Sequence, residues 1–279
     1  MVALKAQLQE LTSPNDPRLA PYRGLKDSAM RRRVEEEQRL FIVEGSLALE
    51  ALLRSPYALI SVLVLPRRLA ALGALQLPET VPVLVAEEEV MRSVTGFDVH
   101  RGLLAAACRR PLPGAEEVLA GRPASPVVVV EGVNDQENLG SIFRNAFCFG
   151  AGALFLSPTC TDPLYRRTVR VSLGSVLRLP FTRLEPWPAL LKLLRNEGFS
   201  LIALTPSPGA EAIGPVAAEL HGCGVALVLG GEGPGLSPEV MAICRRVRIP
   251  MSPRAGSLNV AAASAVALHR FSAAALDGN

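Results

Sequence analysis

Polar side chains follow three apolar runs in the C-terminal half of the chain. Asn138 and Arg144 come after the first run, and Glu232 lies in a glycine-rich loop after the second. Ser257 and Asn259 come after the third run. No histidine lies among these residues, so neither a Ser–His–Asp set nor a metal-assisted hydrolase is well supported. A transfer reaction that depends mainly on positioning two substrates fits these residue types better.

Each of these residues also has an ordinary structural explanation. Asn138 and Asn259 stand where helices are expected to begin, and asparagine is a common helix cap. Arg144 lies off the apolar stripe of its expected helix, as a surface arginine would. A carboxylate held in the middle of a loop, as Glu232 is, needs a cation or hydrogen-bond donors. Either Arg144 or backbone N–H groups could be its partner, and the sequence does not choose between them.

The loop that contains Glu232 does not match the common nucleotide-binding patterns. Four glycines fall within residues 230–235, and Ser237 and Pro238 then begin a helix. A phosphate loop would need Lys followed by Ser or Thr, and a dinucleotide loop would need G-x-G-x-x-G after the first strand with an acidic residue about twenty positions later. Neither requirement is met. The glycines still allow a ligand to approach the backbone closely.

The apolar runs alternate with helical patterns, which predicts an α/β protein in several parts. Residues 1–30 are polar and contain prolines, so we expect a flexible N-terminal arm with structure beginning near Ala29. A small α/β domain is expected over residues 31–110, a proline-rich linker over 111–126 with a short helical patch at 115–119, and a larger domain over 127–279. In the small domain we expect strands at 40–45, 60–66 and 81–86, a further apolar segment at 101–110, and helices from Arg31, from Ser46, at 67–75 and near Glu87.

The larger domain contains the most apolar runs. Strands are expected at 127–132, 153–157, 176–181, 200–205, 225–231 and 247–251, with helices after the first strand, at 188–196, from Ser237 and after Asn259. Runs this apolar are covered on both faces, which predicts a mainly parallel sheet with helices on each side. In such a sheet, ligands bind beyond the carboxyl ends of the strands, where the polar residues above are expected to meet.

Composition sets broad limits on the function. The chain is 49% apolar and 20% charged, as folded proteins are, and its net charge of +3 is too small to establish a nucleic-acid partner. Arginines cluster at 31–33, 166–170 and 245–248, although a charged run is often only a solvated face. Five widely spaced cysteines suggest neither disulfides nor zinc. Without a secretory signal or a run long enough to cross a bilayer, we expect a cytoplasmic protein with no membrane partner.

Three segments resemble the signature motifs of the SPOUT superfamily, specifically its SpoU (TrmH-like) branch of S-adenosylmethionine-dependent RNA ribose 2′-O-methyltransferases. The segments read NLGSIFRNA, LVLGGEGPGLS and IPMSPRAGSLNVAAA, and they occur in family order within residues 127–271. The first contains Asn138 and Arg144, the second contains Glu232, and the third contains Ser257 and Asn259.

The resemblance implies a fold, a cofactor and partners. It implies a C-terminal trefoil knot, an exception to the rule against knots, and an RNA-binding domain of the L30e type over residues 31–110. It also implies S-adenosylmethionine without a metal, a structured RNA substrate for which ribosomal RNA is favoured over transfer RNA, and a homodimer that completes the site. The cofactor would touch Thr205, Gly230, Gly231, Ile249, Met251 and Leu258. The catalytic set would be Asn138, Arg144, Glu232, Ser257 and Asn259. RNA phosphates would be held by Arg166, Arg167 and Arg170, with Tyr165 stacking on a base.

Two positions depart from the family pattern. Pro253 stands where the family usually has glycine, and Ala261 stands where it often has serine. Proline fixes one backbone angle and removes an N–H donor, so Pro253 predicts a differently shaped cofactor loop or weaker binding.

The resemblance assigns Arg144 to the ribose hydroxyl. Because a guanidinium rarely gives up its proton, Arg144 is expected to orient this hydroxyl rather than act as a base.

Two other accounts stay open at this point. One is a catalytically silent RNA-binding protein of the same fold. The other is an unrelated nucleotide-binding α/β enzyme such as a dehydrogenase, although its glycine fingerprint is missing.

Overall fold

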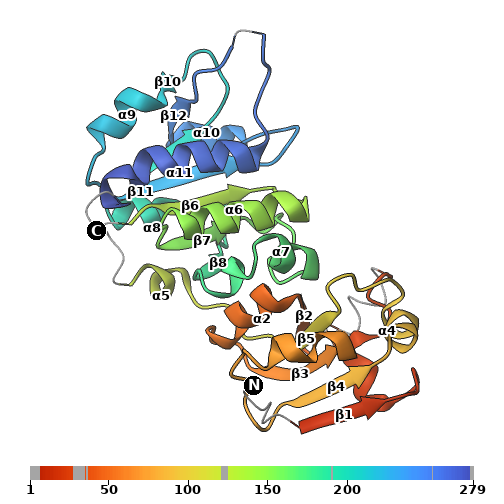
Figure 1. The fold of residues 1–279 in the computed structure, drawn as a ribbon. Coiled ribbons are helices and arrows are strands. Elements are labelled where there is room, and N and C mark those ends of the chain that lie inside the picture. Colours follow the sequence, from red (N-terminus) through yellow and green to blue (C-terminus); the bar gives the residue numbers. More distant parts are fainter. Residues whose placement is uncertain are drawn as a thin grey trace. The chain divides into compact units, whose positions relative to one another are not determined.

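The computed structural model describes residues 7–27, 35, 37–120, 125–189, 191–252 and 254–276. The chain divides into two compact units (Figure 1). The first consists of Met1–Pro111 and Leu164–Arg178, and the second of Leu112–Pro163 and Leu179–Asn279. Residues 164–178, which the sequence places inside the larger domain, therefore pack with the first unit.

The first unit is built on a mixed β-sheet. In the described part of the chain it has five strands in the order β1-β4-β3-β5-β2. Strand β4 is parallel to β1 and β3, whereas β5 is antiparallel to β2 and β3. The strands are β1 (Gln7–Leu11), β2 (Leu40–Glu44), β3 (Leu59–Val64), β4 (Pro82–Ala86) and β5 (Leu103–Cys108). The strands expected at 40–45, 60–66 and 81–86 are thus confirmed, and the apolar segment at 101–110 is a strand as well.

Short helices connect and cover these strands. They are α2 (Ser46–Leu53), η2 (Pro66–Arg68), α3 (Leu69–Leu72), α4 (Glu88–Thr95), α7 (Arg166–Val171) and η3 (Ser175–Leu177). The helix predicted over 67–75 is shorter than expected, because its first turn is a 3-10 turn opened by Pro66 and its α-helical part ends before Gly73. The helix expected from Arg31 lies largely outside the described residues.

The prediction of a flexible arm over residues 1–30 is wrong for the part that the structure describes. Strand β1 pairs with β4 in parallel register, and Leu19, Tyr22 and Leu25 are fully or almost fully buried in the core of this unit. The buried Tyr22 hydroxyl donates to the Ser61 carbonyl oxygen at 2.9 Å. The prolines that suggested a loose arm instead lie in turns, and Pro17 begins the 3-10 helix η1 (Pro17–Tyr22), where a missing N–H costs nothing.

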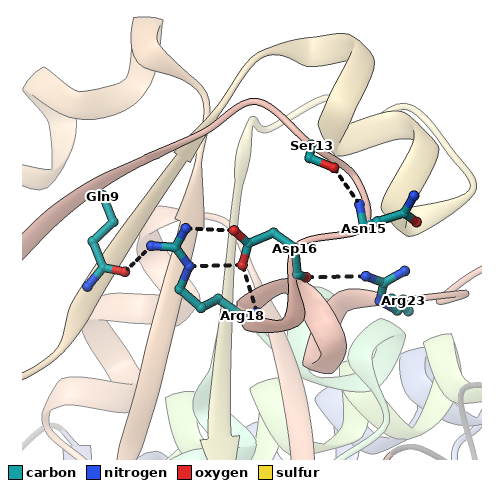
Figure 2. Close-up of polar contacts among 6 residues, drawn as sticks. All are labelled: Gln9, Ser13, Asn15, Asp16, Arg18 and Arg23. Carbon is teal, nitrogen blue, oxygen red and sulfur yellow. Dashed lines mark hydrogen bonds and ion pairs between the residues drawn. The ribbon is translucent and has the colours of Figure 1, made fainter.

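Polar contacts fix the start of η1 (Figure 2). The Asp16 carboxylate caps the helix by accepting from the backbone N–H of Arg18 at 2.9 Å. The Arg18 guanidinium donates to both Asp16 oxygens, at 2.9 and 2.6 Å, and to the Gln9 side-chain oxygen of β1 at 2.8 Å. The hydrogen bonds to Arg18 lower the pKa of Asp16 to about 2. This network joins the edge strand to the helix that follows it.

The second unit is built on a parallel sheet. In the described part of the chain it has seven strands in the order β10-β12-β9-β11-β6-β7-β8, and every pair is parallel. The strands are β6 (Val127–Glu131), β7 (Ala153–Leu156), β8 (Phe181–Arg183), β9 (Ser200–Leu204), β10 (Glu211–Ala212), β11 (Val225–Gly230) and β12 (Arg245–Arg248). The predicted parallel α/β sheet is confirmed.

Helices cover both faces of this sheet (Figure 1). They are α5 (Ala115–Leu119), α6 (Gln136–Cys148), α8 (Leu191–Asn196), α9 (Ile213–Glu219), α10 (Pro238–Ile243) and α11 (Val260–Leu276). Helices α5, α8 and α10 share one apolar core with alternate residues of the central strands, while α6 packs against α11 in front of the sheet. The strand predicted over 176–181 is wrong: residues 175–177 form η3 in the first unit, and β8 begins only at Phe181.

Two further features bear on the fold. Among the residues that the structure describes, no helix is both long and apolar enough to span a bilayer. The trefoil knot implied by the family resemblance stays a prediction.

Candidate active site

A pocket of about 650 Å³ lies where the loops after three strands of the parallel sheet meet. One wall is the end of β9 and the residues after it, and a second is the glycine-rich loop that follows β11. The segment that follows β12 and leads into α11 provides the third. The size is typical of pockets for small ligands, and the place at the carboxyl ends of parallel strands is where such sheets bind them.

All six residues predicted to touch a cofactor line this pocket. They are Thr205, Gly230, Gly231, Ile249, Met251 and Leu258. Three residues of the predicted catalytic set, Glu232, Ser257 and Asn259, also line it. Residues from positions 204 to 263 are therefore brought to one cavity, as the family resemblance implied.

The shape of the glycine-rich loop depends on two glycines without room for a side chain. A Cβ atom at Gly230 would collide with the backbone of Gly235, and one at Gly231 would collide with the Gly132 carbonyl oxygen. The loop consequently folds tightly on itself and lies directly against the segment after β6. Gly233 has a positive φ of 89° and open space around it, so this position needs glycine for its backbone angle.

Asn138, Glu232 and Asn259 form one hydrogen-bonded group, although they come from three separate segments: the first turn of α6, the glycine-rich loop and the residue before α11. The amide nitrogen of Asn138 donates to Glu232 Oε1 at 3.0 Å. The amide nitrogen of Asn259 donates to the same carboxylate oxygen at 2.9 Å and to Asn138 Oδ1 at 2.8 Å. We call these three residues the amide–carboxylate triad.

Helix capping holds the two asparagines in place. Asp135 caps α6 by accepting from the backbone N–H of Asn138 at 2.8 Å. Asn259 precedes α11, and its Oδ1 accepts from the backbone N–H groups of Ala261 and Ala262 at 2.9 and 3.2 Å. Its amide nitrogen remains available for the triad. Asn259 therefore has both of the roles that its sequence position allowed, a helix cap and a site contact.

The partners of Glu232 differ from those considered from the sequence. Arg144 and backbone N–H groups were the two possibilities, but the donors are the side-chain amides of Asn138 and Asn259. The reason is that the three loops converge closely enough for neutral amides to reach the carboxylate. Arg144 is exposed on α6 and is not among the residues that line the pocket.

One residue next to Arg144 contributes to the arrangement in a way the sequence did not reveal. The Asn145 amide donates to the Ala261 carbonyl oxygen at 2.8 Å and to the Ser264 hydroxyl at 2.9 Å. These bonds fasten α6 to the first turns of α11, behind the Asn259 cap. A polar residue facing a helix of small side chains was the only signal in the sequence.

The predicted RNA-binding residues lie in the first unit, and two of the arginines contact the same buried acid. The Arg166 guanidinium forms an ion pair with the buried Glu44 carboxylate and lies 4.3 Å from the centre of the Phe97 ring. Arg166 is thus not available as the free phosphate contact that the sequence predicted. Arg170 also reaches Glu44, at 3.5 Å, but its side chain is 36% exposed. Arg167 is exposed, and Tyr165 is half-buried at the start of α7.

Of the other two arginine clusters, the structure describes the one at 245–248. Arg245 pairs with Glu211 and Glu219, each at 2.7 Å, and the hydrogen bonds from Arg245 lower the pKa of both carboxyl groups. Residues 31–33 lie outside the described residues. Pro253 also lies outside them, so the effect of Pro253 on the cofactor loop stays a prediction.

Sequence reasoning also missed a buried acid behind the pocket. Glu131 ends β6, is only 9% exposed, and accepts hydrogen bonds from Trp187 and Ser237. An acidic residue that ends an otherwise apolar strand was the signal for it in the sequence.

Comparisons with known proteins agree with this geometry. The family model described as SpoU rRNA Methylase family matches residues 125–269. An uncharacterized tRNA/rRNA methyltransferase of Mycobacterium tuberculosis is 43% identical over 267 residues, which cover 94% of this chain and 91% of the relative. The 23S rRNA (guanosine(2553)-2′-O)-methyltransferase RlmP of Bacillus subtilis is 27% identical over 83% of this chain and 88% of its own length.

A solved structure extends the similarity to the whole fold. The AdoMet-bound rRNA methyltransferase from Sinorhizobium meliloti superposes with a TM-score of 0.79 at 25% identity, covering 95% of this chain and 98% of its own. The family model covers the segment that contains the pocket and the amide–carboxylate triad, and the mycobacterial relative covers nearly all of the chain. This chain therefore belongs to the SpoU rRNA methylase family.

Proposed function

We propose that this chain is a cytoplasmic enzyme that transfers the methyl group of S-adenosylmethionine to a ribose 2′-hydroxyl of a structured RNA, and that this RNA is ribosomal. The observation that carries the proposal is the meeting of Asn138, Glu232 and Asn259 at a pocket whose lining contains all six expected cofactor residues. Family membership places a methyltransferase in that setting.

The pocket suits S-adenosylmethionine in size and chemistry. Apolar side chains such as Leu229, Ile249 and Met251 can pack against an adenine ring, while the backbone of the glycine-rich loop offers polar groups without side chains in the way. Thr205, Gly230, Gly231, Ile249, Met251 and Leu258 would hold the cofactor. When bound, the cofactor supplies an electrophilic sulfonium methyl group. The AdoMet-bound Sinorhizobium structure of the same fold supports this choice of ligand.

The triad acts on the loops that surround the cofactor and the ribose. Glu232 accepts two amide hydrogen bonds, so its carboxylate is fixed at the pocket. Asn259 links Glu232 to the start of α11, and Asn138 links it to the start of α6. These residues thereby hold three loops in one arrangement, which serves a reaction that depends on alignment. Ser257, which is exposed on the pocket wall, would contact the substrate.

Arg144 would orient the ribose hydroxyl and its phosphate. Its guanidinium stays protonated in proteins, so it attracts the phosphate and donates hydrogen bonds rather than removing a proton. The pocket of its own chain does not include Arg144. We therefore include a homodimer in the proposal, in which Arg144 of a second copy completes each site. In a two-fold dimer the exchange is reciprocal, so both sites would be completed together.

The choice of ribosomal RNA rests on the relatives. The name of the Bacillus relative specifies 23S rRNA and the 2′-oxygen of a guanosine, and the name of the Sinorhizobium protein specifies rRNA. The name of the mycobacterial relative includes both tRNA and rRNA. In the first unit, Arg167 and Arg170 are the proposed phosphate contacts, because both side chains are more exposed than that of Arg166.

Incubation with radiolabelled S-adenosylmethionine and separate pools of unmodified ribosomal and transfer RNA tests this proposal. We expect label in ribosomal RNA, at a linkage that resists alkaline cleavage because its 2′-oxygen is methylated. Label confined to transfer RNA would overturn the choice of substrate. Tight RNA binding without cofactor binding or label would instead show a catalytically silent RNA-binding protein of this fold.

A further inference from the structure

Glu131 is a buried carboxylate that the proposed reaction does not use. It is the last residue of β6, a strand otherwise made of four valines, and it is 9% exposed. A buried carboxylate is costly unless donors surround it. Glu131 has three: Trp187 Nε1 and the Ser237 hydroxyl donate to Oε1 at 2.9 and 2.7 Å, and the Ser237 backbone N–H donates to Oε2 at 2.8 Å.

The backbone of Glu131 contacts the opposite end of the same loop. Strand β6 pairs with β11 so that Glu131 lies opposite Gly230, and the Gly231 N–H donates to the Glu131 carbonyl oxygen at 2.8 Å. Gly231 begins the pocket-lining part of the glycine-rich loop, and Ser237 directly follows it. One residue therefore holds both ends of residues 231–237.

We infer that Glu131 is a positioning residue for the cofactor pocket, which sets the shape of the glycine-rich loop through Ser237. The inference rests on the proposed function in that the pocket ligand is taken to be S-adenosylmethionine. Glu131 does not line the pocket, so its effect must pass through the loop. Ser237 extends that effect to α10, because its hydroxyl also caps this helix by accepting from the Val240 N–H at 3.4 Å. Helix α10 contributes Met241 to the pocket.

The chemistry of the three partners requires a carboxylate rather than an amide. All three groups that face Glu131 are donors, and only an ionised carboxylate can accept from all of them. The N–H₂ group of a glutamine would take the place of one carboxylate oxygen. In the place of Oε2 it would face the Ser237 N–H, and in the place of Oε1 it would face the Trp187 N–H and the Ser237 hydroxyl. Glu131→Gln should therefore release one end of the loop while nearly preserving the volume of the side chain.

The fluorescence of Trp187 can report on the contacts of Glu131. Trp187 is the single tryptophan of the chain, and its indole N–H donates to the carboxylate that holds Ser237. Trp187 does not line the pocket. A change in its fluorescence on adding S-adenosylmethionine would thus report on the loop and its Glu131 contact rather than on stacking with the ligand.

The test compares Glu131→Gln with Ser237→Ala and with a matched control, Glu239→Gln. Glu239 is an exposed acid in the first turn of α10, two residues after Ser237. By calorimetry on the full chain, we expect Glu131→Gln to raise the Kd for S-adenosylmethionine about tenfold, the typical effect of losing a hydrogen bond to a charged group. Glu239→Gln should leave this Kd within about twofold of the wild type.

Two further readouts separate positioning from general destabilisation. With ribosomal RNA as substrate, the KM for S-adenosylmethionine should rise in Glu131→Gln by a larger factor than kcat at saturation falls, because Asn138 and Asn259 still hold Glu232 within the loosened loop. The double variant Glu131→Gln/Ser237→Ala should bind no more weakly than Glu131→Gln alone, since both changes remove the same connection. Additive losses would overturn the proposed route through Ser237.

Hydrogen exchange without cofactor makes the inference independent of the proposed function. We expect the amides of residues 231–237 to exchange faster in Glu131→Gln than in the wild type or in Glu239→Gln. Unchanged exchange there would overturn the inference, whether or not the protein binds S-adenosylmethionine. Faster exchange in a protein whose wild type binds no S-adenosylmethionine would instead contradict the proposed function alone. If Glu131→Gln does not fold, Ser237→Ala alone should show the faster exchange and the raised Kd, and wild-type values in both measurements would refute the inference.

Discussion

At the residue scale, the site depends on neutral amides rather than on a charged pair. Glu232 is exposed and accepts from Asn138 and Asn259, and each asparagine is in turn fixed at the start of a helix. Amide side chains can donate and accept together, which a lysine or arginine cannot do. This property allows Asn259 to cap α11 with its oxygen while its nitrogen holds Glu232. The two roles can be separated by mutation.

Asn259→Ala and Asn259→Asp should have different effects. Alanine removes the cap, so we expect the free energy of unfolding to fall by about 1 kcal/mol and methyl transfer to be lost. Aspartate keeps the capping oxygen but replaces the donor with a negative charge beside Glu232, so stability should stay nearly unchanged while transfer is lost. Urea denaturation and a methyl-transfer assay measure the two quantities. Wild-type transfer by Asn259→Asp would show that Asn259 is only a helix cap.

Asp16 gives a prediction about pH at the same scale. Hydrogen bonds from Arg18 lower the pKa of its carboxyl to about 2 in the folded chain, whereas an unfolded aspartate has an ordinary pKa near 3.9. A lowered folded pKa means that the pairing stabilises the fold above about pH 4 and that this contribution is lost as the pH falls toward 2. NMR titration of the Asp16 carboxyl measures this directly. Arg18→Ala is the control and should return the pKa to its ordinary value; a titration near 4 in the wild type would contradict the contact.

At the element scale, strands that are apolar throughout could be predicted from sequence and short mixed strands could not. Strands β6 and β11 consist of Val, Ala, Leu and Gly apart from Glu131, and both were expected at nearly their observed bounds. Strand β10 has only two residues, and β1 reads QLQEL, so neither has a run of apolar residues to mark it. Both lie at sheet edges, where burial on two faces is not required. Whether such segments form strands depends on their pairing with a neighbouring strand in the folded chain.

The same limit applies to side-chain partners in the site. The three loops could be predicted to converge, because the carboxyl ends of parallel strands share one edge of the sheet. The partner of Glu232 could not, because choosing between Arg144 and the amides requires distances that spacing along the chain does not contain. The partner of Arg166 could not be predicted for the same reason, since Glu44 is 122 residues away in sequence.

Leu19→Ala tests whether the N-terminal segment belongs to the core. Leu19 is fully buried, so its truncation should cost roughly 2–5 kcal/mol of the stability of the first unit, as cavities in packed cores do. Leu8→Ala is the matched control, because Leu8 on β1 is 52% exposed and its truncation should have little effect. Urea denaturation followed by hydrogen exchange of β3 and β4 measures the loss. Equal stability of the two variants would restore the flexible arm first expected for residues 1–30.

At the scale of the whole molecule, the two compact units do not correspond to two consecutive parts of the sequence. Residues 164–178 leave the second unit and pack in the first, where Arg166 and Arg170 contact Glu44 and Gly174 lies against α2. A Cβ atom at Gly174 would collide with Ala51, so this packing is tight. The first unit therefore depends on a segment that interrupts the second unit's part of the sequence. Arg144 does not line the pocket of its own chain, and its contribution from a second copy stays a proposal.

Mixing two inactive variants tests the homodimer. Arg144→Ala and Asn259→Asp should each lack methyl transfer, with RNA affinity within a few-fold of the wild type. If Arg144 acts in the partner's site, a dimer of the two variants contains one site with both residues intact. Random pairing should then restore about a quarter of the wild-type sites. Denaturing and refolding the mixture and assaying transfer measures this, and no recovery from well-folded mixed dimers would show that Arg144 acts within its own chain or not at all.

The chemical identity of the product tests the central claim most directly. After incubation with methyl-labelled S-adenosylmethionine, ribosomal RNA would be digested to nucleosides and the labelled nucleoside analysed by mass spectrometry. The account predicts that the label is on the ribose of a 2′-O-methyl nucleoside and is absent when Asn259→Asp replaces the wild type. Label on a base, or equal labelling by the two proteins, would contradict it.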